Sequence, residues 1–157
     1  MANSKTFNVI STTFCEYLSA DVSGKNHHMG IIPLEAHLGP HPSYVPPLFL
    51  SVTIEPLVQN LVFVIEFVDP KGRLIVRAKF DCETQDQLRH HQVMTSNVQI
   101  PPIPFEGDGE YRVNILDGRN EIIYTRPFFM RTGTAAPAIF TAKSEVNLGP
   151  AFADLFA

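Results

Sequence analysis

The stretch GDGEYRVNILDGRNEIIYTRPFFM, residues 107–130, predicts a complete β-hairpin. In its first half apolar residues alternate with polar ones, which is the period-two pattern of a half-buried strand. The apolar set is Tyr111, Val113 and Ile115. Asp117-Gly118 tolerates positive φ and so reverses the chain. Residues 122–130 are expected to form the second, antiparallel strand of the hairpin. Pro127 donates no amide hydrogen, so beyond it the strand is expected to lie at a sheet edge or to bulge.

Short strand patterns separated by turn residues fill the rest of the domain, and together they predict its fold. The expected strands are residues 6–18, 27–32, 48–55, 61–68, 74–80, 92–100, 110–116 and 122–130. Such a series is typical of an all-β, antiparallel two-sheet β-sandwich. Gly109 two residues before Tyr111 matches the tyrosine corner of immunoglobulin-like sandwiches. We therefore expect an immunoglobulin-like or C2-like sandwich of about eight strands, with residues 35–47 as its longest irregular loop.

Length and charge exclude several classes of protein. A chain of 157 residues buries enough surface to fold without a disulfide or metal. Its net charge of −4 and its scattered basic residues argue against nucleic-acid binding. It has neither a signal-peptide pattern nor an apolar run long enough to span a bilayer, so we expect a cytoplasmic protein with no membrane partner. Cys15 and Cys82 are expected to be reduced core thiols, with a single disulfide as the alternative.

The composition changes after residue 131, which predicts three segments. Residues 1–131 form the sandwich domain, 132–145 a flexible linker, and 146–157 an apolar tail that is a possible docking segment. The apolar residues of the tail are Val146, Leu148, Phe152, Leu155 and Phe156. The last three lie on one face if the tail forms a helical turn, which needs a surface to dock on. The tail either folds back over its own sheet, docks on another subunit or protein, or is disordered.

The sequence offers little catalytic chemistry. Glu35, His37 and His41 share one loop and are weak candidates for a zinc site, although solvated histidines are the expected state. A nucleophile elbow and a phosphate-binding glycine loop are both absent. Asp21, Asp69, Asp108 and Asp117 lie singly in turns, which favours turn formation over a calcium site. We therefore expect no enzyme and no cofactor.

An ordered set of short motifs resembles a group of small uncharacterised bacterial domains. The motifs are residues 15–25 (CEYLSADVSGK), 29–31 followed by Pro33, 47–50, 68–72 and 109–112. The resemblance covers about residues 14–131. It implies a β-sandwich of bacterial or phage origin and carries no activity. The chain departs from the group at His27-His28 and in its long tail, so a role specific to those features is not implied.

Two hypotheses about function follow. The first is a non-catalytic protein–protein interaction or assembly module that binds a protein partner or a second copy of itself. It would use the tail together with the outward-facing Phe49 and Phe129, which we expect to contribute to an apolar patch. The second is a small-molecule or metal-binding sensor, or a hydrolase, that uses the loop of residues 35–47 with Glu35, His37 and His41.

Overall fold

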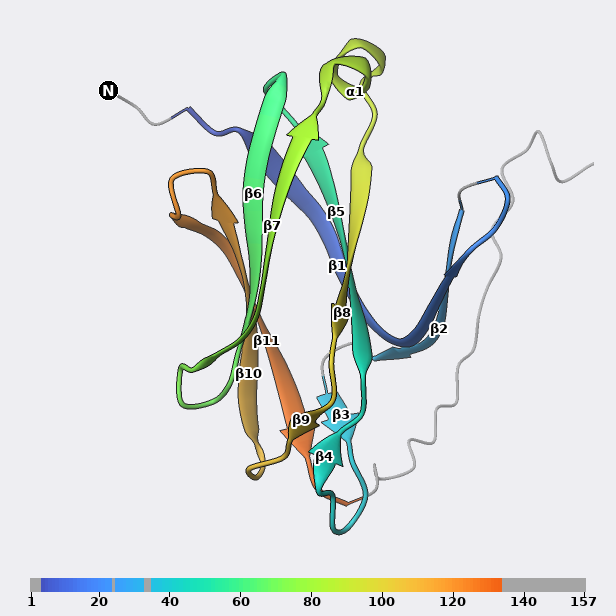
Figure 1. Ribbon diagram of the computed structural model, residues 1–157, viewed down its shortest axis with the longest axis vertical. Helices are drawn as coiled ribbons and strands as arrows, with labels where there is room; N and C mark the ends of the chain where they lie inside the picture. Colours follow the sequence, from blue (N-terminus) through green and yellow to red (C-terminus); the bar gives the residue numbers. More distant parts are fainter. Residues whose placement is uncertain (1–3, 24, 33–34, 134–157) are drawn as a thin grey trace, which may run out of the picture.

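The computed structural model describes residues 4–23, 25–32 and 35–133, and these form an all-β fold (Figure 1). This part of the chain contains eleven strands and one short helix. The elements are β1 (Phe7–Ala20), β2 (Asn26–Ile32), β3 (Glu35–His37), β4 (Tyr44–Val45), β5 (Leu48–Pro56), β6 (Asn60–Val68), β7 (Leu74–Glu83), α1 (Gln85–His90), β8 (Met94–Ile100), β9 (Ile103–Pro104), β10 (Gly109–Asp117) and β11 (Ile122–Arg131). No helix in the described ranges is long and apolar enough to cross a membrane.

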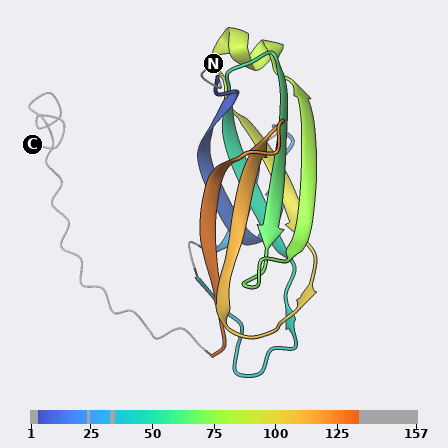
Figure 2. The same cartoon turned by 90° about the vertical axis from the view of Figure 1, so that its left-hand side faces the viewer.

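The strands form two main sheets that lie face to face. One has four antiparallel strands in the order β2-β1-β5-β8, and the other has five in the order β3-β11-β10-β6-β7. In Figure 1 the two sheets are seen from the side, with β6, β7, β10 and β11 on the left and β1, β5 and β8 on the right. Figure 2 shows the same two layers after a quarter turn. A small third sheet pairs β4 with β9.

Two expectations about the sheets are wrong. The five-stranded sheet is mixed and not wholly antiparallel, because β3 runs parallel to β11. The loop of residues 35–47 is not irregular throughout, because it contains β3 and β4. These two strands and β9 have only two or three residues each, too few to show an alternating pattern in the sequence. They also account for the difference between the eight strands expected and the eleven described.

The hairpin of β10 and β11 forms as predicted, but its second strand is not a free edge beyond Pro127. The two strands pair from Gly109 opposite Met130 to Leu116 opposite Ile122. On its other side β11 pairs with β3 over Phe129–Arg131. Pro127 lies just before this pairing, so its missing amide hydrogen interrupts no bond to β3.

Side chains from both sheets fill a single core. Phe14 of β1 is fully buried, and its ring centroid lies 4.3 Å from that of Phe128 in β11. Phe67 of β6 stacks on Tyr111 of β10 at 5.6 Å. Arg126 closes the side of the sandwich between β11 and β1 by donating to the hydroxyl oxygen of Thr12 at 2.8 Å. The contacts of Phe14 with Phe128 and, at 6.0 Å, with Phe67 therefore join the two sheets, whereas the stack of Phe67 on Tyr111 lies within one sheet.

Three tight turns share one hydrogen-bonding pattern, which confirms that their aspartates form turns. In each turn one carboxylate oxygen accepts the amide N–H groups two and four residues later. The pairs are Ser23 and Lys25 on Asp21, Lys71 and Arg73 on Asp69, and Arg119 and Glu121 on Asp117. One oxygen of each carboxylate thus holds the backbone of its turn.

Candidate functional site

The hairpin of β1 and β2 stands out from the body of the domain. β1 is fourteen residues long, and it pairs with β5 only as far as Cys15. From Phe14 onward it pairs with β2, so residues 16–20 extend past β5 with β2 as their only neighbouring strand in the described part of the chain. Figure 1 shows this hairpin bending away from the two layers on the right of the view.

Strand register gathers apolar side chains on the outer face of the four-stranded sheet. Cys15 lies opposite Ile31 on one side and Phe49 on the other, and Tyr17 lies opposite Met29. These five side chains point away from the core, because their neighbours along the strands, such as Phe14 and Leu50, point into it. We call this set, Cys15, Tyr17, Met29, Ile31 and Phe49, the apolar trough.

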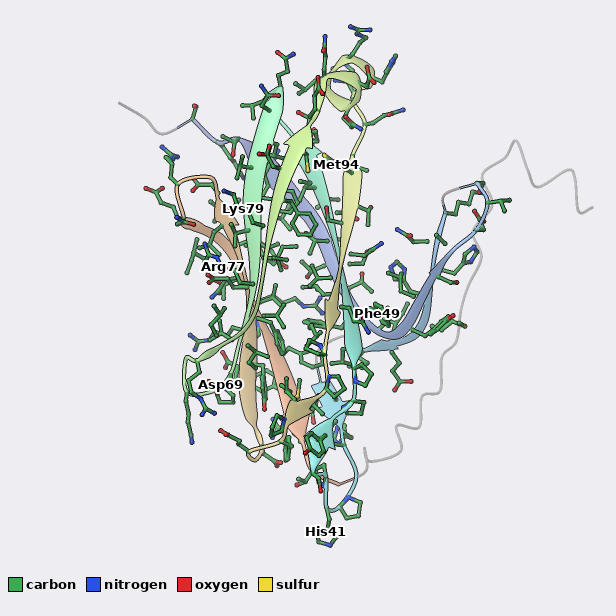
Figure 3. All side chains as sticks on the ribbon, in the orientation of Figure 1. His41, Phe49, Asp69, Arg77, Lys79 and Met94 are labelled. Atoms are coloured by element: carbon green, nitrogen blue, oxygen red, sulfur yellow. The ribbon has the colours of Figure 1, made fainter. Side chains whose placement is uncertain are left out.

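Three side chains of the trough are exposed to solvent, and Cys15 between them is buried. Tyr17, Met29 and Ile31 keep 53%, 52% and 59% of their surface in contact with solvent. Cys15 is fully buried, although it lies on the outer face and is not part of the core between the sheets. Figure 3 shows the labelled Phe49 at the angle between β5 and the hairpin. The hairpin therefore leaves the four-stranded sheet at an angle beside Phe49.

The buried thiol at the trough floor is not set up for chemistry. Burial raises the pKa of Cys15, and a hydrogen bond with the backbone of Tyr17 opposes the shift only in part. A raised pKa keeps the sulfur as a thiol near neutral pH, whereas a reactive cysteine needs the thiolate. Cys15 and Cys82 are both free, as expected from the sequence.

β2 has a free edge beside the trough. It is the last strand of its sheet, and within the described residues no strand pairs with its outer side. Gly30 has φ of +64° in the middle of β2, and a Cβ there would lie 2.7 Å from the Glu16 carboxylate. Glycine therefore lets the Glu16 side chain lie across β2 on the face opposite the trough.

The tip of the hairpin is held by Asp21. Its carboxylate accepts hydrogen bonds from the Ser23 hydroxyl at 2.6 Å and from the Lys25 amide at 3.1 Å, and it lies 3.1 Å from the ring of His27. These contacts lower the pKa of Asp21 to about 2. The hydrogen bond from the Ser23 hydroxyl has the largest effect, followed by those with His27 and the Lys25 amide. The ionised carboxylate thus fixes the turn that joins β1 to β2.

The predicted pair of outward phenylalanines does not come together. Phe49 is half-buried in the trough, whereas Phe129 lies on β11 in the other sheet. The guanidinium of Arg131 lies 5.6 Å from the centre of the Phe129 ring and partly covers it. The other predicted partner-binding residues, Val146, Leu148, Phe152, Leu155 and Phe156, lie outside the described residues.

The loop of residues 35–47 borders a cavity of about 590 Å³. Its lining includes Glu35 and His37, whose side chains are 2.8 Å apart, among apolar residues from β2 and from the loop before β5. Arg131 also contacts Glu35 at 2.8 Å. His41 does not line the cavity, because it lies at the tip of the loop (Figure 3). Among the described residues no three metal-binding side chains converge, so the proposed zinc set does not form.

A second cavity, of about 410 Å³, lies where the turn of residues 69–73 meets the start of β10. Arg73 bonds to the carboxylates of Asp69 and Glu106 there, and Lys71 lies 3.7 Å from Glu106. Burial, and then the nearby carboxylates of Asp69 and Glu106, raise the pKa of Tyr111 in the cavity wall. Arg73 and Lys71 are therefore paired with carboxylates, which leaves little unpaired positive charge to bind an anionic ligand.

Sequence reasoning missed Tyr17, Met29 and Ile31. A signal was present, because residues 14–18 carry apolar side chains at both alternating positions, which marks a strand with two apolar faces. Only the register with β2 and β5 shows that these side chains lie together. No family model matches this chain, and no curated protein matches it.

Proposed function

We propose that the protein is a non-catalytic interaction module that binds a protein partner, either another protein or a second copy, at the apolar trough. The observation that carries the proposal is that register places Tyr17, Met29 and Ile31 side by side while each remains more than half exposed. Scattered apolar residues are normal on a surface, but a contiguous set on one strand pair is typical of an interaction site. The proposal also includes the C-terminal tail, residues 146–157, as a docking segment.

The trough and the free edge of β2 fit the addition of a strand from a partner. In that mode the backbone of the edge strand binds the partner strand, and side-chain contacts on one face select it. Covering the exposed halves of Tyr17, Met29 and Ile31 would contribute roughly 2–4 kcal/mol, since fully burying one such side chain contributes about 1.5–3 kcal/mol. This is enough to favour a partner whose matching side chains are apolar.

The scaffold in this proposal is an immunoglobulin-like or C2-like sandwich. The two facing sheets and the buried Tyr111 support that comparison, and the parallel β3 departs from it. Sandwiches of this kind carry recognition on loops and sheet edges, and the hairpin of β1 and β2 supplies both.

Capture of partners by purified variants tests the proposal. Met29→Asp places a charge in the trough, and Ile122→Asp is the matched control, because Ile122 is 57% exposed but lies in the five-stranded sheet. We expect wild type and Ile122→Asp to retain the same protein from lysates of cells that express the chain, and Met29→Asp to lose it. The purified complex should then show at least tenfold weaker binding to Met29→Asp by calorimetry. Equal binding to both variants would refute the proposal.

A second candidate function is the binding of a small molecule in the cavity beside residues 35–47. The observation in its favour is the Glu35 and His37 pair within an otherwise mostly apolar lining. A ligand with a basic group and an apolar body would suit this lining. A thermal-shift screen of such amines should give a stabilising compound whose effect is lost in Glu35→Gln; a screen without any Glu35-dependent shift would exclude this function.

A further inference from the structure

We infer that the occupant of the apolar trough, in the absence of a partner, is the C-terminal segment of the same chain. Residues 144–148 (SEVNL) would add to the free edge of β2 as a further strand, with Val146 and Leu148 beside Met29 and Ile31. The inference deepens the proposed function, since it names what a partner at this site has to displace.

The first argument is the match between the edge and the segment. Met29 and Ile31 are spaced by two residues and face the trough, and they are followed across the sheet by Tyr17 and Cys15. Val146 and Leu148 have the same spacing, with Asn147 between them, so a strand here directs both apolar side chains to one face. An added strand would also give the unpaired backbone groups of β2 their hydrogen-bond partners.

The second argument is reach. The described chain ends at Gly133, and Phe129, four residues earlier, pairs with Glu35. Ile31 lies four residues before Glu35. Two extended stretches of four residues and one step between strands therefore put Ile31 within about 33 Å of Gly133. Residues 134–145 can extend to about 40 Å, which is enough to bring Val146 to β2 in the same molecule.

The third argument is the effect of the tether. A short flexible connection holds its end at an effective concentration of order 1 mM. Docking with a dissociation constant of about 0.1 mM would then keep the edge of β2 about 90% occupied at protein concentrations well below about 1 mM. A second copy would have to be present at a comparable concentration to compete. The same chain is therefore the favoured occupant.

Hydrogen exchange of the full-length protein, followed by mass spectrometry, tests the inference. We expect the amides around Val146 and Leu148 to exchange about tenfold more slowly than an unfolded chain, equally at protein concentrations about a hundredfold apart. The double variant Asn147→Pro, Leu148→Pro removes two successive amides, one of which faces β2 in either register, so it should abolish this protection and speed exchange in β2. The double variant Ala135→Pro, Ala136→Pro, in the connecting residues, is the matched control and should keep it.

Three results would overturn the inference. Unprotected exchange in the wild-type tail means that nothing docks, and protection unchanged in the double variant Asn147→Pro, Leu148→Pro means that no strand is added. Protection that appears only at the higher concentration assigns the site to the tail of a second copy. Peptides from β5 and β6 monitor folding in every sample. The experiment needs no partner, so an unprotected tail together with partner binding that Met29→Asp abolishes would sink this inference and leave the proposed function standing.

Discussion

Replacing Asp117 with alanine tests how far the hairpin of β10 and β11 depends on its turn. One carboxylate oxygen of Asp117 accepts the amide N–H groups of Arg119 at 2.9 Å and of Glu121 at 3.0 Å. The other oxygen contacts the Arg119 guanidinium at 3.1 Å. Asp117 is only 5% exposed, so the alanine variant leaves a covered site in which water replaces the lost acceptor poorly.

The expected loss can be worked out from these bonds. A hydrogen bond to a charged group contributes about 1.5–3 kcal/mol when it is buried, and less where water reaches the donor. Arg119 and Glu121 are exposed residues, so we take the lower value for each amide and expect Asp117→Ala to lower the free energy of unfolding by about 3 kcal/mol. Asp117→Asn keeps an acceptor oxygen and should cost about 1 kcal/mol.

Urea unfolding followed by circular dichroism measures this loss, since the chain has no tryptophan for fluorescence. Asp81→Ala, at an exposed site on β7, is the control and should change stability by less than about 0.5 kcal/mol. If Asp117→Ala unfolds with the same midpoint as Asp81→Ala, the turn does not stabilise the hairpin and the reasoning fails.

The pH dependence gives an independent check. Burial acts to raise the pKa of Asp117, but hydrogen bonds from the amides of Glu121 and Arg119 and from the Arg119 side chain outweigh it and lower the pKa. A lowered folded-state pKa stabilises the fold above the unfolded pKa, near 3.9, and this contribution is lost as the pH falls through the folded value. The difference between wild type and Asp117→Ala should therefore shrink below about pH 4. A constant difference would contradict the role of the charge.

Three further predictions concern the core and the hairpin of β1 and β2. Phe14→Ala removes a fully buried ring that stacks on Phe128 and should cost about 3–5 kcal/mol in urea unfolding; a cost below about 1 kcal/mol would mean that the core closes around the gap. Asp21, with its pKa lowered to about 2, should keep the hairpin turn formed at pH 4 and release it as the pH falls through about 2, as followed by the Ser23 amide resonance; a midpoint near 3.9 would contradict this. Gly30→Ala should lower the stability of β2 by about 1 kcal/mol, because Gly30 has a positive φ that alanine adopts at a cost. Glu16→Ala removes the side chain that the new Cβ would meet, but it leaves φ unchanged, so the Gly30→Ala, Glu16→Ala double variant should recover only part of the lost stability.

The parts of the fold that were predictable are those with long, regular patterns. The alternation through Tyr111, Val113 and Ile115 predicted β10, and the apolar run of residues 61–68 predicted a strand, which is β6 between β10 and β7. β3, β4 and β9 were not predictable, because two or three residues carry no period and their pairing depends on distant strands.

The candidate site was less predictable than the fold. Phe49 was identified as outward-facing, but its neighbours Tyr17, Met29 and Ile31 come together only through the register of three strands. Alternation within one strand assigns side chains to faces and does not show which faces meet across a sheet. Glu35 and His37 lie together because they share one short strand, whereas His41 follows a glycine and a proline and does not join them.

Site-specific photocrosslinking from the trough tests the central claim most directly. A photoreactive phenylalanine analogue replaces Met29 in one sample and Ile122 in the other, and both proteins are irradiated in the cells that express them. We expect position 29 to yield a crosslinked product whose mass exceeds that of the single chain by the mass of a protein partner, and position 122 to yield none. No such product from position 29, or equal products from both positions, would contradict the assignment of the trough as the interaction surface.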